Sequence, residues 1–346
     1  MLSLSACSSI SYYSQAVRGH LDLTRRKQDI EQLLADPATP DALRGRLATV
    51  RSIRQFAIDE LALPDSGSYT SYADLERDVT VWLLSAAPEL SLEARRWCYL
   101  FVGCLSYRGY FQRDAAEKLA ARLRDQDYDT SISPSLAYST LGLMNDPVLN
   151  TMLAHDDAEL AGILFHEMAH ELNYLKGDSL FSESFASTVE RVGRERWLAA
   201  RGAASDRDRQ RLERERAQQF NQLLLDTRAQ LEQLFGSDES ERDKRSGKQQ
   251  IYQGLDQGYR QLKERWHGYA AYDAWMQRDP NNADLALIAT YELAVPAFLA
   301  LLAQNKGDLP TFYEAVETLS RLDPQQRESR LSELSQLAES DLMNSR

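Results

Sequence analysis

The amino-acid sequence predicts an α+β protein that is mainly α-helical and carries one small mixed sheet. Apolar residues recur at helical spacing from residue 12 to about residue 87. Residues 95–107 then change to a compact apolar and aromatic run, which is typical of a strand. The charge-dense residues 203–265 contain two series of helically spaced apolar residues, which indicates a long antiparallel helical hairpin.

These elements are interpreted as one domain. A chain of 346 residues can form one large domain or two ordinary ones, and no internal repeat divides this one. The predicted domain covers residues 8–346 and has four successive parts: an N-terminal helical part (8–94), a sheet with the candidate site (95–202), a charged helical hairpin (203–265) and a C-terminal helical part (266–346).

Within the second part, local signals set the expected boundaries. Residues 107–111 read as a turn, and Asp114 with Glu117 is a predicted capping box that opens a short helix. Residues 128–140 are rich in Ser, Thr and Tyr and include Pro134, which in a strand implies an edge position or a bulge.

Two longer helices follow. The first is predicted to open at Asp156, paired with Glu159 as a capping box, and to end near residue 176 before Gly177. The second is predicted from about Ser182 to residue 201. In the hairpin that comes next, residues 236–247 separate the two apolar series, and its charges are interpreted as a solvated surface.

The N-terminal residues resemble a lipoprotein processing site. Leu4-Ser5-Ala6-Cys7 has the order of such a site, so residues 1–7 are interpreted as a signal remnant ending at the lipidated Cys7. No Asp follows Cys7, which favours the outer membrane, with the protein facing the periplasm. The alternative is a cytosolic N-terminus with an incidental cysteine.

The other two cysteines, Cys98 and Cys104, lie six residues apart in the run that reads as one strand. At about 3.3 Å per residue they would be about 20 Å apart, too far for a disulfide. The sequence therefore predicts two buried free thiols, unless a bulge or hairpin brings them together.

Charge and hydropathy restrict the partners. The formal net charge of −12 argues against nucleic-acid binding. No uninterrupted apolar run of 18 residues is present, so membrane attachment is expected through the N-terminal lipid only.

The central motif is His166-Glu167-Met168-Ala169-His170. Residues four apart in a helix share one face, so both imidazoles can reach a single ion. Zinc accepts neutral imidazole and suits such a site, so one Zn²⁺ per chain is predicted as the cofactor. Glu167, offset by one position, is predicted to act as the general base for a zinc-activated water.

A catalytic zinc needs a third protein ligand. A third histidine at the short metzincin spacing is missing, because Lys176 occupies that position. Glu183 and Glu190 are the candidates, and they lie seven residues apart on one predicted helix face. The residues alone leave the choice between them open.

The segment from Phe181 to Glu190 resembles the one that supplies the third ligand in gluzincin aminopeptidases. The resemblance implies a zincin-like catalytic core, with Glu183 as the ligand and Glu190 as the carboxylate that supports a ligating histidine. Ser182 and Ser184 depart from the family pattern, where Asn and Gly stand, and the gap from His170 is shorter.

Nearly the whole chain is similar to a family of bacterial lipoproteins described as predicted aminopeptidases. The similarity is carried by the metal-motif helix and by six further blocks: residues 103–104, 107–111, 137–142, 146–149, 281–283 and 291–298. It implies a peptide substrate and amino-terminal specificity. Tyr291, by its place in the last block, is the first candidate to stabilise the oxyanion, ahead of Tyr138 and Tyr110.

Two further interpretations concern substrate binding. Tyr138-Ser139-Thr140 is a candidate edge strand for pairing with the peptide backbone, or else an ordinary structural strand. Asp146 stands near the place of a gluzincin amine anchor, but a turn role before Pro147 is favoured. His155 and His267 are interpreted as surface or packing residues.

Together these features predict a zinc-dependent peptidase, with aminopeptidase specificity implied by the resemblance. An endopeptidase or dipeptidase on the same site is the first alternative. The second is a non-catalytic lipid-anchored scaffold or binding protein with structural zinc, whose unidentified protein partner would bind the hairpin at 203–265.

Overall fold

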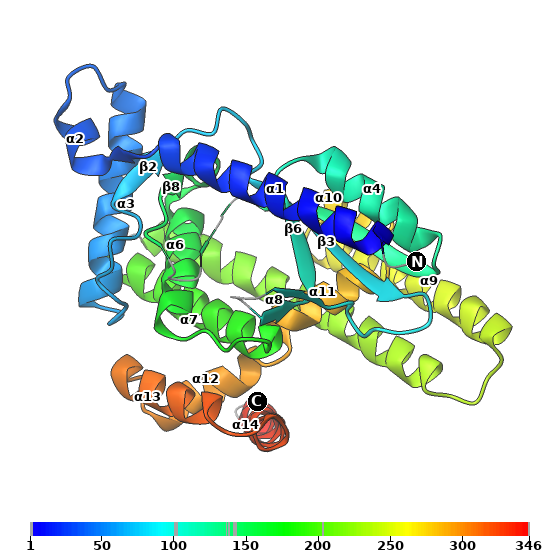
Figure 1. Cartoon of the computed structure of the whole chain (residues 1–346). Coiled ribbons are helices and arrows are strands. Elements are labelled where there is room, and N and C mark those ends of the chain that lie inside the picture. The colour runs from blue at the N-terminus through cyan, green and yellow to red at the C-terminus, as the bar shows by residue number, and fades with distance from the viewer. Residues whose placement is uncertain are drawn as a thin grey trace.

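The computed structural model describes the backbone of residues 3–99, 103–135, 137, 139–140, 144–202 and 204–344, and the side chains of this set except residues 3–11, 204–208, 210 and 338–344. The protein is mainly helical with small sheets, as predicted (Figure 1). The helices are α1 (Ser3–Arg25), α2 (Ile30–Ala35), α3 (Asp41–Asp59), α4 (Arg113–Arg124), α5 (Asn150–Leu153), α6 (Asp157–Leu172), α7 (Ser179–Ala200), α8 (Ala204–Phe235), α9 (Glu241–Arg265), α10 (Asp273–Met276), α11 (Asn282–Glu292), α12 (Val295–Gln304), α13 (Leu309–Ser320) and α14 (Pro324–Asn344).

The strands of the described chain form three small sheets rather than the single sheet expected. They are β1 (Gln28–Asp29), β2 (Ser71–Ala73), β3 (Val81–Pro88), β4 (Trp97–Tyr99), β5 (Gly103–Leu105), β6 (Tyr107–Tyr110), β7 (Tyr128–Ser135) and β8 (Val148–Leu149). The sheet orders are β1-β2-β8, β6-β3-β7 and β4-β5. Only the first is mixed, because β2 pairs antiparallel with β1 and parallel with β8.

Several predicted boundaries are wrong. Helix was expected up to about residue 87, but β2 and β3 lie within that range. β3 is the middle strand of the antiparallel sheet β6-β3-β7, called the central sheet below. It is buried on both faces over Leu84–Ala87. A short apolar run of this kind has no alternation that separates it from a buried helix, which accounts for the error.

The expected strand over residues 97–107 is instead two paired strands followed by a third. β4 and β5 are antiparallel and set Cys98 directly opposite Cys104, with a Cα–Cα distance of 3.8 Å. The two cysteines form a disulfide, so the prediction of free thiols is wrong. On the distance estimate for one extended strand, a disulfide was possible only if a bulge or hairpin brought the two cysteines together, and the pairing of β4 with β5 does this. The expected turn at 107–111 is also wrong, since Tyr107–Tyr110 is strand β6.

At two further places the structure refines the local signals. Helix α4 begins after Gln112 without a side-chain cap, so the predicted capping box at Asp114 is wrong, although Asp114 lies in the first turn, where its charge favours the helix dipole. Pro134 lies in β7, which is an edge strand of its sheet, and this confirms the edge alternative.

Helices α6 and α7 pack closely in the centre of the protein (Figure 1). The Asp156 side chain caps α6 by accepting from the N–H groups of Ala158 and Glu159, and the helix ends at Leu172, four residues before the expected end. Helix α7 begins at Ser179 with Asp178 as its cap. A Cβ at Gly193 would lie 2.7 Å from the Phe165 ring, so glycine is needed for the close approach.

Helices α8 and α9 form the predicted antiparallel hairpin, with Gly236–Ser240 as the connection. Gly247 lies inside α9 rather than between the helices. Buried aromatic and aliphatic residues join the hairpin to α10 and α11; they include Phe220, Leu255, Tyr259 and Leu285. This cluster is separate from the main core around α3, α6, α7, α12 and α13.

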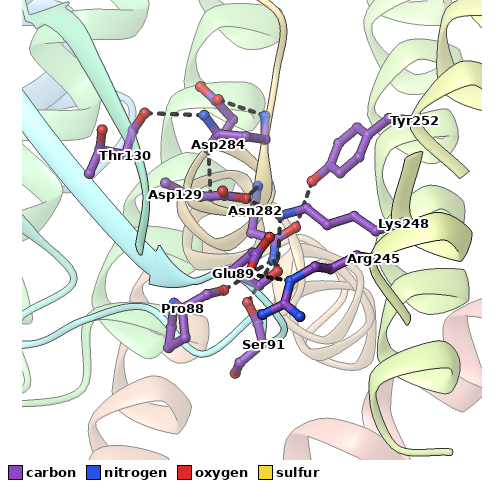
Figure 2. A network of polar contacts seen from close by, with 12 residues as sticks. Pro88, Glu89, Ser91, Asp129, Thr130, Arg245, Lys248, Tyr252, Asn282 and Asp284 are labelled. Atoms are coloured by element: carbon purple, nitrogen blue, oxygen red, sulfur yellow. Dashed lines mark hydrogen bonds and ion pairs between the residues drawn. The ribbon is translucent and has the colours of Figure 1, made fainter. Parts of the chain in front are cut away.

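Asn282, at the start of α11, connects the hairpin to the central sheet (Figure 2). Its side-chain nitrogen donates to three backbone carbonyl oxygens at the end of β3 and just after it, those of Pro88 at 3.2 Å, Glu89 at 2.8 Å and Ser91 at 3.1 Å. Its oxygen accepts from Tyr252 of α9 at 2.9 Å. Asn281 and Asp284 form a capping box in the same place. The start of α11 is therefore fixed by a network of polar contacts.

The helical stretch Asn282–Gln304, which contains α11 and α12, is long and apolar enough to cross a membrane, judged by length and composition alone over a window of 18 residues. In the structure, 56% of that window is buried inside the protein. A helical stretch that is apolar all round and packed inside a protein is also typical of a core helix.

Candidate metal centre

Three side chains from α6 and α7 converge on one point. His166 and His170 lie on one face of α6, one turn apart, and their Nε2 atoms are 3.2 Å apart. Glu183 comes from the first turns of α7, and its Oε2 lies 3.3 Å from Nε2 of His166 and 3.4 Å from Nε2 of His170. Three donor atoms thus form a nearly equilateral triangle.

This triangle fits a tetrahedral metal ion. Two ligand atoms of a tetrahedral site lie about 1.6 bond lengths apart, which for zinc bonds of about 2.0–2.1 Å gives about 3.3 Å. The three measured separations of 3.2, 3.3 and 3.4 Å match one face of such a tetrahedron. Two imidazoles and a carboxylate are also a donor set that divalent transition metals accept. His166, His170 and Glu183 could therefore hold a metal ion.

Two neighbouring side chains orient the triad. Oε2 of Glu190 lies 3.3 Å from Nδ1 of His166. The other ring nitrogen of His166, Nε2, therefore faces His170 and Glu183. The Tyr107 hydroxyl donates to Oε1 of Glu183 at 3.3 Å, so the other carboxylate oxygen is the one that faces the histidines. Gly162 makes room for Glu190, because a Cβ there would lie 3.2 Å from its side chain.

The triad favours positive charge. Burial alone would lower the pKa of His166, but hydrogen bonds to Glu183 and Glu190 outweigh burial and raise that pKa well above its ordinary value. Burial would raise the pKa of Glu183, yet His170 and His166 bring it well below its ordinary value. A cation shared by these groups would satisfy the same electrostatic demand.

The triad lies in a cavity of about 440 Å³, within the usual range for small-ligand sites. Glu167 lines this cavity beside the two histidines. Tyr291 of α11 also lines it, and its ring stacks near His166 with centroids 6.2 Å apart. Burial first, then the carboxylates of Glu183 and Glu167, raise the pKa of Tyr291 well above its ordinary value, so its hydroxyl stays protonated and able to donate.

The predicted substrate strand has a different conformation. Tyr138 lies outside the described residues, and Ser139 and Thr140 are not in a strand, although both line the cavity. They are held by Asp146, whose Oδ2 accepts from the N–H of Thr140 at 2.7 Å and from the hydroxyl of Ser139 at 3.3 Å. The Asp146 carboxylate takes the backbone N–H of Thr140, and neither Ser139 nor Thr140 lies in a strand, so the predicted strand conformation is wrong for these two residues. Their pairing with a peptide backbone stays a prediction.

Asp146 itself is 1% exposed, and its carboxylate also accepts from the hydroxyl of Thr140 at 3.0 Å; its favoured role in a turn before Pro147 stays a prediction. Tyr110 lies on β6 next to Gly109, and its ring packs on Tyr12. Alternation along β6 turns Tyr107 and Gly109 toward the cavity and Arg108 and Tyr110 away from it.

His155 pairs with Glu159 at 2.9 Å at the start of α6, away from the triad, and His267 lies beyond the end of α9. The side chain of Cys7, which falls in α1, lies outside the described side chains. Tyr107 is a residue of the site that the sequence did not predict. Its segment was interpreted as a turn, and only the alternation along a strand could have directed it to the site.

Ser184, a departure from the gluzincin pattern, has a structural role. Its hydroxyl donates to the carbonyl of Thr290 and accepts from the N–H of Ala294, both at 3.3 Å. It therefore ties α7 to the helix that carries Tyr291. The hydroxyl of Ser182 likewise accepts from the N–H of Leu175 at 3.0 Å and holds the connection between α6 and α7.

Fold and site together define a mainly helical protein with a cluster of three donor side chains that could hold a metal ion, at the wall of a cavity. The chain belongs to the family described as "Putative aminopeptidase", whose model matches residues 11–331. Membership in this family indicates peptidase activity and a hydrolase. No curated protein and no solved structure matches the chain.

Proposed function

We propose that this protein is a zinc-dependent peptidase whose zinc is held by His166, His170 and Glu183. The observation that carries the proposal is the triangle of donor atoms at 3.2–3.4 Å, beside Glu167 in the same cavity. Bound there, zinc would supply Lewis acidity that polarises a peptide carbonyl and makes water a nucleophile near neutral pH.

The residues of the chain would then act in sequence. Glu167 accepts the proton of the attacking water and passes it to the leaving amine. The Tyr291 hydroxyl donates to the developing oxyanion, a role that its protonated state permits. Glu190 keeps His166 in the tautomer that presents Nε2, and Tyr107 keeps Glu183 turned toward the histidines.

The proposal is tested by measuring metal content and peptide turnover on the same preparations. One zinc per chain is expected, and Glu167→Gln should retain it while turnover falls by about 10²–10⁴-fold. Glu159→Gln, at the exposed start of the same helix, is the matched control and should keep its activity. Turnover that survives in Glu167→Gln, or a protein that binds no zinc, would sink the proposal.

We also propose that Cys7 carries a lipid that anchors the protein to the outer membrane, facing the periplasm. The support is the residue order Leu4–Cys7 and the Cys98–Cys104 disulfide, since disulfides persist in oxidising compartments. Mass spectrometry of the N-terminal peptide from a bacterial membrane fraction tests this. Acylated Cys7 in the wild type and a soluble Cys7→Ala variant are expected; an unmodified, soluble wild type would contradict it.

A further inference from the structure

The cavity extends from the metal triad over the central sheet into an apolar bay. The bay is lined by Tyr12 of α1, Val81 and Leu83 of β3, Tyr99 of β4, Leu105 of β5 and Gly109 of β6. Figure 1 shows α1 passing over β6 and β3, and the Tyr12 ring packs 5.5 Å from that of Tyr110. The Cys98–Cys104 disulfide holds the hairpin that contributes Tyr99 and Leu105.

Gly109 keeps this bay open. A Cβ at Gly109 would lie 3.1 Å from Cγ1 of Val81 and 3.9 Å from Cδ2 of Leu83, so any side chain would fill the space above them. The backbone there is ordinary strand paired with Leu83, so glycine is not needed for its conformation. Gly109 lies about 7 Å along β6 from Tyr107, which touches Glu183. The bay and the triad therefore line the same cavity, with Tyr107 of β6 contacting Glu183.

The charges around the cavity are equally informative. The described residues that line the cavity include two carboxylates, Glu167 and Glu183. They include no other acidic residue and no Lys or Arg. The sequence also has no acidic or basic residue at the undescribed positions 100–102, 136, 138 and 141–143. Asp146, which the sequence comparison places near a gluzincin amine anchor, accepts hydrogen bonds from Thr140 and Ser139. His20 is the other titratable residue of the described cavity wall, apart from the tyrosines and the residues of the candidate metal centre. Burial is the main cause that lowers its pKa.

A free amino terminus held in a cavity needs a carboxylate partner, and a free carboxyl terminus needs a cation. In the described wall both carboxylates already serve the metal centre and its chemistry. We propose that the site cleaves within peptides, taking a bulky apolar side chain next to the scissile bond into the apolar bay, without recognising either charged terminus. This inference rests on the proposed peptidase function and specifies its substrate class.

The test uses the full-length, zinc-loaded protein and one peptide scaffold with Phe, Leu, Ala, Lys or Asp at a single position. Each peptide is made with free termini and with an acetylated N-terminus and amidated C-terminus. Since burying a Phe or Leu side chain is worth about 10- to 100-fold in binding, kcat/KM should fall by that factor for Ala and at least as much for Lys or Asp. Blocking the termini should change kcat/KM by less than about fivefold, the effect of an exposed charge.

Variants of the bay provide the second arm. Gly109→Leu should fill the bay and reduce kcat/KM for the Phe peptide about 10- to 100-fold more than it reduces kcat/KM for the Ala peptide. Leu83→Ala should weaken the preference for Phe over Ala without changing zinc content. Gly254→Leu is the matched control, because nothing lies within 4 Å of a Cβ at that glycine of α9. Zinc content and circular dichroism establish that each variant is folded.

The outcomes separate the two proposals. Cleavage that requires a free amino terminus, or that treats Phe and Ala alike, overturns this inference and leaves the peptidase proposal standing. If no peptide is cleaved, the peptidase proposal fails. The bay is then judged by binding: the zinc-loaded Glu167→Gln variant should bind the blocked Phe peptide at least about tenfold more tightly than the blocked Ala peptide. Equal binding overturns the inference in that case too.

Discussion

The hydroxyl of Tyr107 donates to Oε1 of Glu183 at 3.3 Å, and this contact joins strand β6 to the triad of His166, His170 and Glu183 on α6 and α7. Burial first, and then the adjacent Glu183 carboxylate, raise the pKa of Tyr107 well above its ordinary value. The phenol is therefore a permanent donor at neutral pH, and it fixes which carboxylate oxygen faces the histidines.

Removal of this hydroxyl should loosen the metal site. In Tyr107→Phe we expect zinc affinity to fall about 10- to 100-fold, the usual effect of losing a partner that orients a metal ligand. Competition with a chromogenic zinc chelator measures it. Tyr110→Phe, on the same strand but facing away from the cavity, is the control and should bind zinc as the wild type does. Equal affinities in the two variants would contradict the orienting role.

The roles of the two glutamates of α7 can be separated by parallel variants. Glu183 is within 3.4 Å of both histidine Nε2 atoms, whereas Glu190 lies against Nδ1 of His166. Glu183→Gln should therefore lower zinc affinity by more than about 100-fold, and Glu190→Gln by about 10- to 100-fold. Isothermal titration with zinc distinguishes them. A larger loss in Glu190→Gln would make Glu190 the third ligand instead.

Reduction of the Cys98–Cys104 disulfide should cost modest stability, because the loop it closes is short, with a sequence separation of 6. For such a loop the chain-entropy relation gives about 2 kcal/mol. The double variant Cys98→Ser/Cys104→Ser should show this decrease in the free energy of unfolding in urea. Thiol alkylation of the unfolded, unreduced wild type should leave both cysteines unlabelled; labelling of both would restore the free-thiol prediction.

Asp146 should impose a pH dependence on stability. Burial is the main cause that raises its pKa from 3.8 to about 6 in the folded protein. Between these values the unfolded carboxyl ionises while the folded one stays protonated, so the folded state loses stability as pH rises, by a total on the order of 3 kcal/mol. This loss is complete above about pH 6 and absent below about pH 4.

Asp146→Asn removes this titration. Its free energy of unfolding relative to the wild type should therefore increase by up to about 3 kcal/mol from pH 4 to pH 7, as measured by urea unfolding at several pH values. Asp238→Asn, at an exposed position between α8 and α9, is the control and should show a constant difference. A pH-independent difference for Asp146→Asn would show that its carboxyl does not titrate in this range.

Features that depend on local periodicity were accessible from the sequence. Residues four apart on a helix share a face whatever surrounds them, so the meeting of His166 and His170 follows from their spacing. The α8–α9 hairpin followed from two apolar series with a break between them. Pro134 has no backbone N–H to donate to a neighbouring strand, and this equally local property predicted an edge position or a bulge, of which the structure shows the edge position.

Contacts between distant segments required the tertiary structure. Glu183 and Glu190 share a helix face, and only the packing of α6 on α7 decides which one reaches both imidazoles. The disulfide depends on the antiparallel pairing of β4 with β5, and the approach of Tyr107 to Glu183 depends on where β6 pairs with β3. Sequence spacing alone determined which side chains share one face of a helix or strand. The tertiary structure decided which side chains of different elements come into contact, because many packings satisfy the same local periodicity.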